Sequence, residues 1–142
     1  MAISGTAVQD RSILRGSPLV SSFAVKDLDA ARTFYRDTLG LDVRDDSDMG
    51  IFEIHGAGET SVMVYPKPDH QPAVFTVLNF PVKDIDATVN LLMAAGVTME
   101  HYDRPDGPKT GPKGIARDDD GSAIAWFTDP SGNILSVLEN AR

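Results

Sequence analysis

The stretch Val25-Lys26-Asp27-Leu28-Asp29-Ala30 recurs 57 positions later as Val82-Lys83-Asp84-Ile85-Asp86-Ala87. Each copy follows an apolar run typical of a strand and begins an amphipathic run typical of a helix. Self-similarity at one offset indicates that the chain contains two copies of one supersecondary unit. The first helix is expected to end at Gly40 and the second at Gly96, one residue shorter, because glycine favours the left-handed conformation at helix ends.

The two helices are predicted in detail by their first residues and their apolar spacing. Asp27 or Asp29 is expected to cap the first helix, and Asp84 or Asp86 the second, by accepting hydrogen bonds from free backbone N–H groups. Residues three and four apart then form the buried stripe of each helix. These stripes are Leu28, Ala31, Phe34, Tyr35, Thr38 and Leu39 in the first helix, and Ile85, Val89, Leu92 and Met93 in the second.

The remaining segments complete the same order of elements in both halves. Strands are predicted over 19–25, 51–55 and 61–65 in the first half, and over 73–82, 97–102, 123–128 and 134–138 in the second. Residues 42–48 are acidic and polar, which favours a solvated turn, and 103–121 are expected to form a long loop. The sequence therefore predicts a flexible arm over 1–17 and one domain over 18–142, with module one at 18–65, a proline-rich linker at 66–72 and module two at 73–140.

Composition and charge exclude several classes of partner. The chain of 142 residues has a formal net charge of −8 and no cysteine. An acidic chain disfavours nucleic acid and anionic membranes as partners, and without cysteine there is no disulfide framework or thiolate chemistry. The first residues lack the apolar run of a signal peptide, and no stretch is long and apolar enough to span a bilayer. We expect a cytoplasmic protein with neither nucleic-acid nor membrane partners.

Three stretches of the sequence carry a resemblance to a known family. They are 23–35, which reads Phe-Ala-Val-Lys-Asp-Leu-Asp-Ala-Ala-Arg-Thr-Phe-Tyr, then Leu39-Gly40-Leu41, and 126–135, which contains Asp129-Pro130-Ser131-Gly132-Asn133. With these motifs the chain resembles the vicinal-oxygen-chelate superfamily of glyoxalases, extradiol dioxygenases and bleomycin-resistance proteins. The resemblance implies an α+β fold in which two tandem βαβββ modules form a curved eight-stranded mixed sheet with a cavity on its concave face. It also implies a homodimer.

The resemblance also indicates where metal-dependent relatives hold their ion. Their four ligands, usually His, Gln or Glu, correspond here to Val20, Met63, Val77 and Ser136. Three apolar side chains and one neutral hydroxyl do not bind a divalent cation strongly. We therefore expect no metal and no other cofactor.

The candidate site follows from which side chains face the cavity. The expected ligand-binding residues are mostly apolar: Val20, Ser22, Met63, Tyr65, Val77, Ser136 and an aromatic ring, Trp126 or Phe127, of which one faces the cavity and the other the helices. Alternation within 51–55 places Glu53 and His55 opposite Phe52 and Ile54. A carboxylate beside an imidazole is a possible general base, which makes this pair the weak catalytic candidates, although a solvated sheet rim is the alternative.

Other polar residues give weaker signals. Lys109, Lys113 or Arg117 in the long loop could meet an anionic ligand at the cavity mouth. His101 is expected at an edge, and His70, in the proline-rich linker, is expected to be solvated.

Three functions remain open at this stage. The first is binding of an apolar or aromatic small molecule in the cavity without a metal, since burying apolar surface favours such ligands. The second is an enzyme of the glyoxalase-like lyase, isomerase or dioxygenase type, with metal ligands at other positions or with metal-independent chemistry. The third is a module whose apolar surface serves only dimerisation. Because one fold supports many chemistries, the fold alone does not decide among them.

Overall fold

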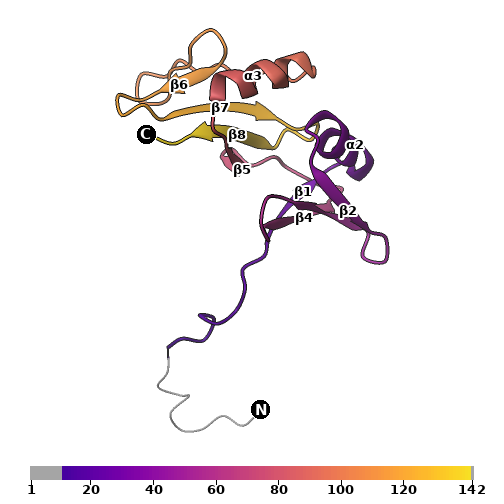
Figure 1. The fold of residues 1–142 in the computed structure, drawn as a ribbon. Coiled ribbons are helices and arrows are strands. Elements are labelled where there is room, and N and C mark those ends of the chain that lie inside the picture. The colour runs from indigo at the N-terminus through magenta and orange to yellow at the C-terminus, as the bar shows by residue number, and fades with distance from the viewer. Residues whose placement is uncertain (1–10, 142) are drawn as a thin grey trace.

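The computed structural model describes residues 11–141, which form two modules with the same order of elements (Figure 1). Module one contains β1 (Ser21–Val25), α2 (Leu28–Thr33), η1 (Phe34–Thr38), β2 (Asp42–Asp46), β3 (Ile51–His55) and β4 (Ser61–Pro66). Module two contains β5 (Thr76–Pro81), α3 (Ile85–Ala94), β6 (Ile115–Arg117), β7 (Ala123–Thr128) and β8 (Ile134–Glu139). The predicted α+β fold with tandem βαβββ modules is confirmed.

Each module forms its own four-stranded mixed sheet. The strand orders are β1-β4-β3-β2 and β5-β8-β7-β6, so equivalent strands occupy equivalent places. In both sheets the first strand of the module is at an edge and runs parallel to the last strand, while the remaining pairs are antiparallel. The eight strands are thus shared between two hydrogen-bonded sheets.

The repeated sequence begins both helices in the same way. Asp27 accepts a hydrogen bond from the backbone N–H of Ala30 (3.1 Å), and Asp84 accepts one from Ala87 (3.0 Å). The first aspartate of each repeat is therefore the cap, which resolves the two alternatives left by the sequence. Capping by aspartate satisfies a donor that the helix itself leaves unpaired.

The first helix contains one residue more than the second between its cap and its terminal glycine. Module one absorbs this residue in η1, a π-helical segment where the N–H of Leu39 bonds the carbonyl of Phe34 (2.9 Å). A π-helical turn accommodates an inserted residue without displacing both helix ends. Gly40 and Gly96 then end the two helices with φ of 72° and 94°, as predicted.

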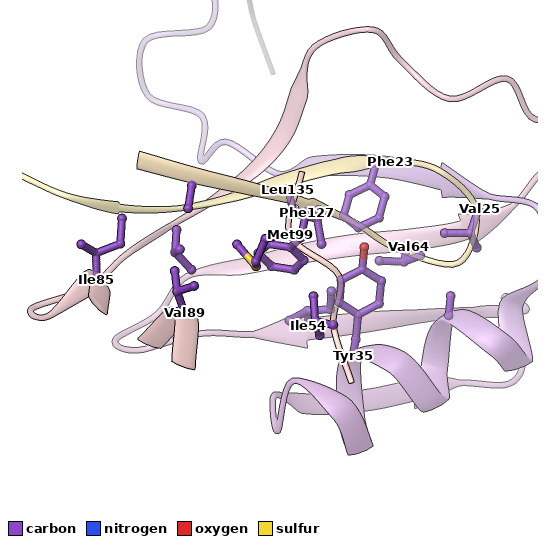
Figure 2. Packing of buried hydrophobic residues seen from close by; sticks show 14 of the residues in the cluster. Phe23, Val25, Tyr35, Ile54, Val64, Ile85, Val89, Met99, Phe127 and Leu135 are labelled. Carbon is purple, nitrogen blue, oxygen red and sulfur yellow. The ribbon is translucent and has the colours of Figure 1, made fainter. Parts of the chain in front are cut away.

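One hydrophobic core joins the two modules. Figure 2 shows Tyr35 pointing from its helix toward Phe23 and Val64, with Phe127 and Leu135 of module two nearby. The core also contains Val25, Ala31, Phe52, Ile54, Ile85, Val89, Val97, Met99, Ile115, Ala123, Ala125 and Val137. Both modules contribute fully buried side chains to this core.

The β7–β8 turn carries a buried polar network that ties module one to module two. Asp129, 4% exposed, accepts a hydrogen bond from the hydroxyl of Tyr35 (2.7 Å). The same carboxylate accepts bonds from the backbone N–H groups of Ser131 and Asn133 and from the side-chain amide of Asn133, each at 2.9 Å. Four donors thus stabilise a carboxylate that would be costly to bury alone.

Further bonds from the same turn reach β1 and the linker. The Asn133 amide donates to the carbonyl of Ala24 (2.9 Å), and Ser131 accepts from the N–H of Lys26 (2.9 Å). The side-chain nitrogen of Asn133 donates to both the Ala24 carbonyl and the Asp129 carboxylate, so the other side-chain atom is the amide oxygen. This oxygen accepts a hydrogen bond from Nε2–H of His70 at 3.1 Å. His70 is therefore half-buried in this network, and its expected solvation is wrong. We call these residues and Tyr35 the turn network.

Two strands differ from their sequence predictions. Residues 42–48 were expected to form a turn, but Asp42–Asp46 form β2, paired with β3. This strand is at the sheet edge, where charged side chains prevent pairing with a further strand. The same charges mask the alternation of apolar residues from which a strand is predicted. Residues 97–102 were expected to form a strand but make only one isolated bridge, Met99 with Phe127.

The strand position next to β7 is taken instead by β6, which lies inside the expected long loop. Gly114 allows this, because a Cβ there would lie 2.7 Å from the carbonyl oxygen of Glu100. The predicted inward position of Met93 is also wrong, since that side chain lies one residue past the stripe and is 49% exposed.

The chain before β1 leaves the two modules (Figure 1). Residues 13–20 are exposed, including Leu19 (95%) and Val20 (70%). The expected flexible arm, 1–17, lies partly outside the described residues, since the structure describes the chain from residue 11. No helix within 11–141 is long and apolar enough to cross a membrane.

Candidate functional site

The open face of module one is defined by the register of its strands. Phe23, Phe52 and Val64 face the core, so their neighbours face outward. On that outward face Ser22 pairs with Met63, Ala24 with Tyr65, Glu53 with Met63, and His55 with Ser61. Three expected site residues, Ser22, Met63 and Tyr65, thus share one face with Glu53 and His55. Val20 precedes β1 and is not paired with another strand in the described structure.

The open face of module two is built around three residues in a row across β5, β8 and β7. Asn79 pairs with Ser136, and Ser136 pairs with Trp126. The fully buried Ser136 hydroxyl donates to the side-chain oxygen of Asn79 at 2.5 Å. Asn79 lies 57 positions after Ser22, so the internal repeat identifies it as the equivalent of an expected site residue, a signal that the sequence interpretation missed.

Trp126 and Phe127 face opposite sides of β7. Phe127 is 1% exposed and belongs to the core, so its expected place in the ligand cavity is wrong. Trp126 faces outward and is held from two sides: its Nε1–H donates to the Thr76 hydroxyl (3.2 Å), and its ring meets Tyr102 edge-on, with centroids 5.3 Å apart. A fixed indole ring provides a flat apolar wall.

A cavity of about 540 Å³ lies beside Trp126 on this face. Its volume is within the range of small-molecule sites. Its wall is partly apolar, from Trp126, Ile124 and Leu138, and its rim includes Lys109 and Arg117. All of its lining residues lie within 107–140, so module two alone forms it.

The rim of this cavity is ordered by local pairing. The backbone N–H of Thr110 donates to the carbonyl of Tyr102 (2.9 Å), the N–H of Tyr102 donates to the Thr110 hydroxyl, and Asp103 and Lys109 form an isolated bridge. Burial raises the pKa of Tyr102, which keeps its ring neutral beside Trp126. Arg117 is paired with Asp86 at 2.5 Å, which leaves Lys109 as the better placed cation for a ligand.

The four positions that hold metal in relatives do not suit a divalent ion here. Val20 is 70% exposed, Met63 is half-buried, Val77 lies at the irregularity between Thr76 and Leu78, and Ser136 is bonded to Asn79. Three of these side chains offer no oxygen or nitrogen ligand, and the fourth is a neutral hydroxyl. Within 11–141, no three His, Asp, Glu or Cys side chains lie close enough together to hold an ion.

Glu53 and His55 form a polar cluster on module one with Asp42 and Arg44. His55 Nε2 lies 3.8 Å from a Glu53 carboxylate oxygen, which exceeds hydrogen-bond length, and this nitrogen is buried without a hydrogen-bond partner. Arg44 pairs with Asp42 (2.9 Å) and lowers the pKa of that carboxyl. The cluster is separate from the Trp126 cavity.

The remaining predicted contacts lie elsewhere. His101 is exposed beside a second surface hollow that it lines together with Met93 and Lys113. Lys113 is therefore outside the Trp126 cavity, whereas Lys109 and Arg117 border it.

Comparisons with known proteins agree with this architecture. Residues 19–137 match the Glyoxalase/Bleomycin resistance protein/Dioxygenase superfamily, and the chain belongs to that family. The predicted resemblance is thereby confirmed. No curated protein matches the chain significantly.

Several solved structures share the fold. A lactoylglutathione lyase from Agrobacterium tumefaciens is 21% identical, with a TM-score of 0.64 over 89% of this chain and 95% of that one. TnmS3, an antibiotic binding protein from Streptomyces sp. CB03234, is 25% identical, with a TM-score of 0.60 over 87% and 97%. A glyoxalase family protein from Bacillus anthracis, described as putative, is 20% identical, with a TM-score of 0.62 over 87% and 95%.

Proposed function

We propose that this protein binds an aromatic small molecule in the cavity beside Trp126, without a metal ion. The observation that carries the proposal is a rigid indole wall in a cavity of about 540 Å³ whose rim presents Lys109. A planar ring stacked on Trp126 would bury apolar surface on both partners. Polar or anionic substituents would reach the rim. The likeness to TnmS3, an antibiotic binding protein, supports a binding role.

Binding without metal is supported by the chemistry of the four positions discussed above. Val20 and Val77 supply no donor atoms, Met63 supplies only a thioether sulfur, and the Ser136 hydroxyl is engaged with Asn79. Recognition in this cavity would then depend on stacking, shape and hydrogen bonds. Affinity should be the same after treatment with a chelator and after addition of Zn²⁺ or Mn²⁺.

Trp126 is the single tryptophan of the chain, so its fluorescence reports directly on the cavity. A panel of aromatic metabolites and antibiotics would be screened by thermal shift, since a ligand at 100 times its Kd stabilises by about 2.7 kcal/mol. Hits would be titrated by tryptophan quenching. We expect one site per chain, and Trp126→Ala, followed by calorimetry, should weaken binding by about tenfold, the equivalent of about 1.4 kcal/mol.

Two control variants make this test specific. Trp126→Phe keeps an aromatic wall and should retain affinity within about threefold, less than the effect of one lost stacking contact. His101→Ala, outside the cavity, should bind as the wild type does. A panel without any hit, or hits that are indifferent to Trp126→Ala, would refute the proposal.

A catalytic role for His55 and Glu53 is a second proposal, favoured by the buried and unpartnered Nε2 of His55. If Nε2 carries the proton toward Glu53, Nδ1 is left free to accept one from a substrate. Because this cluster is separate from the Trp126 cavity, the whole panel would be assayed for turnover, and not only the compounds that bind beside Trp126. His55→Gln should abolish any turnover while leaving Trp126 quenching intact, and a His55→Gln protein with unchanged turnover would remove this candidate.

A homodimer is a third proposal, concerning assembly. Exposed apolar side chains lie next to the two edge strands β1 and β5: Leu19, Val20, Val74 and Phe75. Open strand edges with apolar neighbours favour association with another chain. Sedimentation equilibrium should give a dimer, and Val20→Glu with Phe75→Glu should shift it to monomer. A wild-type monomer at high concentration would contradict the proposal.

A further inference from the structure

A second cavity, different from the one beside Trp126, lies between the two modules. Its volume is about 540 Å³, and it is lined by Leu41, Ile54 and Val62 of module one and by Leu78, Phe80 and Pro81 of module two. A smaller space of about 180 Å³ shares Leu41 and Phe80 with it and extends toward Leu92 of α3. We call the two spaces together the intermodule cleft.

The lining of the cleft is uncharged and mostly apolar. No described residue bordering either space is charged. A few polar side chains, including Ser61 and Asn79, border the larger space. The smaller space has one polar neighbour among the described residues, Thr88. Asn79 accepts a bond from Ser136 through its oxygen, so its amide nitrogen is the group that can donate to an occupant. One end of the cleft thus offers a hydrogen bond, and the rest is apolar.

The hydrogen bonds of the turn network, which join the two modules, lie away from the cleft. The turn network fixes Ala24, Lys26 and Tyr35 to the β7–β8 turn. The cleft is lined instead by the β3–β4 hairpin, by the end of β5 and by Leu41. None of the described residues that line the cleft takes part in these bonds, so the cleft and the turn network lie at different places on the two modules. An open apolar space of this size favours an apolar guest over water.

We infer that the intermodule cleft binds one uncharged, elongated apolar molecule, such as a long-chain alcohol or ester, with its polar end at Asn79. An anion is disfavoured for two reasons. The described lining contains no cation to pair with it, and the net charge of the chain is −8. Leu41 and Phe80 line both spaces, and an extended molecule that passes these two side chains occupies both.

The neutral fluorescent probe N-phenyl-1-naphthylamine tests this site directly, because its emission rises in apolar surroundings. We expect one probe per chain. Val62→Phe and Leu41→Phe each add volume inside the cleft and should weaken probe binding at least about tenfold, as expected when a site of fixed walls is filled. Leu91→Phe makes the same kind of change on an exposed part of α3 and should leave binding unchanged. Two variants that fill the cleft are used. If circular dichroism shows that one of them is misfolded, the other still tests the inference.

Competition then tests the charge of the occupant. Dodecan-1-ol should displace the probe at concentrations at least about tenfold lower than dodecanoate, because only the alcohol avoids burying a charge. Equal displacement by both would overturn the inference. So would probe binding that Trp126→Ala abolishes and Val62→Phe does not, because the probe would then occupy the module-two cavity.

A second copy of the chain is the competing occupant. Probe binding would therefore be measured over a range of protein concentrations, with the assembly followed by sedimentation. The inference requires the same Kd for the probe throughout this range. Binding that appears only when a dimer dissociates on dilution would overturn it, because a partner chain would then fill the cleft.

Discussion

The β3–β4 turn of module one and the β7–β8 turn of module two occupy equivalent places in their modules but make different contacts. The first, at 56–60, is exposed, and its Thr60 hydroxyl bonds only to the carbonyl of Ala57 nearby. The second contains the buried Asp129 and Asn133 and bonds to β1, η1 and the linker. Equal topology therefore does not imply equal energetics, since one turn merely reverses the chain and the other joins the modules.

The helices show the matching difference. Tyr35 lies eight positions after its capping aspartate, and the equivalent residue in module two is Leu92. Tyr35 has a buried carboxylate to bond, whereas Leu92 borders the intermodule cleft. Tyr35 thus forms part of the polar tie between the modules, whereas the equivalent Leu92 contributes an apolar side chain to the cleft.

Removing the centre of the turn network should have the largest effect. Asp129→Ala leaves Tyr35, Ser131 and Asn133 with unpaired buried donors, so we expect a loss of about 3 kcal/mol or more in the free energy of unfolding. Urea denaturation followed by circular dichroism measures it. Glu59→Ala, in the exposed β3–β4 turn of module one, should change stability by less than about 0.5 kcal/mol. Equal effects of the two variants would show that the two turns are equivalent.

Deleting only the Tyr35 hydroxyl isolates the bond between modules. Tyr35→Phe keeps the packed ring and should cost about 1.5 to 2 kcal/mol, the range for a hydrogen bond to a charged group. Tyr102→Phe is the matched control, since its hydroxyl makes no hydrogen bond in the described structure, and should cost less than about 0.5 kcal/mol. A neutral Tyr35→Phe would mean that packing alone joins the modules.

The same hydroxyl predicts a pH dependence. Burial, together with the Asp129 carboxylate, raises the pKa of Tyr35 far above its ordinary value. The stabilisation is complete below about pH 10, where the phenol is neutral in both states, and is lost at higher pH because only the unfolded chain releases the proton. From about pH 10 upward, the wild type should lose about 1.4 kcal/mol per pH unit more than Tyr35→Phe. Parallel stability curves for the two proteins from about pH 9 to 11 would contradict this assignment.

The capping aspartates should show where the modules are alike. Asp27→Ala and Asp84→Ala each remove one bond to a helix N–H and should each cost about 1 kcal/mol. The double variant should lose about the sum, within about 0.5 kcal/mol, because the two sites share no partner. Unequal costs, read from urea denaturation midpoints, would mean that the difference between modules extends to the helix starts.

The sequence predicted the elements that local chemistry determines. The repeat, both capping aspartates and both terminal glycines follow from the needs of a helix end, which the nearest residues supply. β2 and β6 were missed because they are outer strands. β2 carries charges that resemble a turn, and β6 is only three residues long within a segment rich in glycine and proline.

The candidate site was less accessible for a related reason. The choice between Trp126 and Phe127 depends on the exact phase of β7 after the preceding turn, which side-chain types alone do not determine. Asn79 could have been found from the repeat, since it is the counterpart of Ser22. The intermodule cleft could not, because it combines Leu41, Val62 and Phe80 from separate elements that meet only in the folded chain.

The π-helical segment η1 has a consequence for how the duplicated halves diverged. A single residue gained in one copy would ordinarily rotate everything that follows it by about 100° around the helix axis. Confined to one wide turn, the extra residue of module one leaves Asp27 and Gly40 in their roles, and Tyr35 stays at the same distance from its cap as Leu92. The two halves can therefore differ by one residue in helix length while their capping aspartates and terminal glycines stay equivalent.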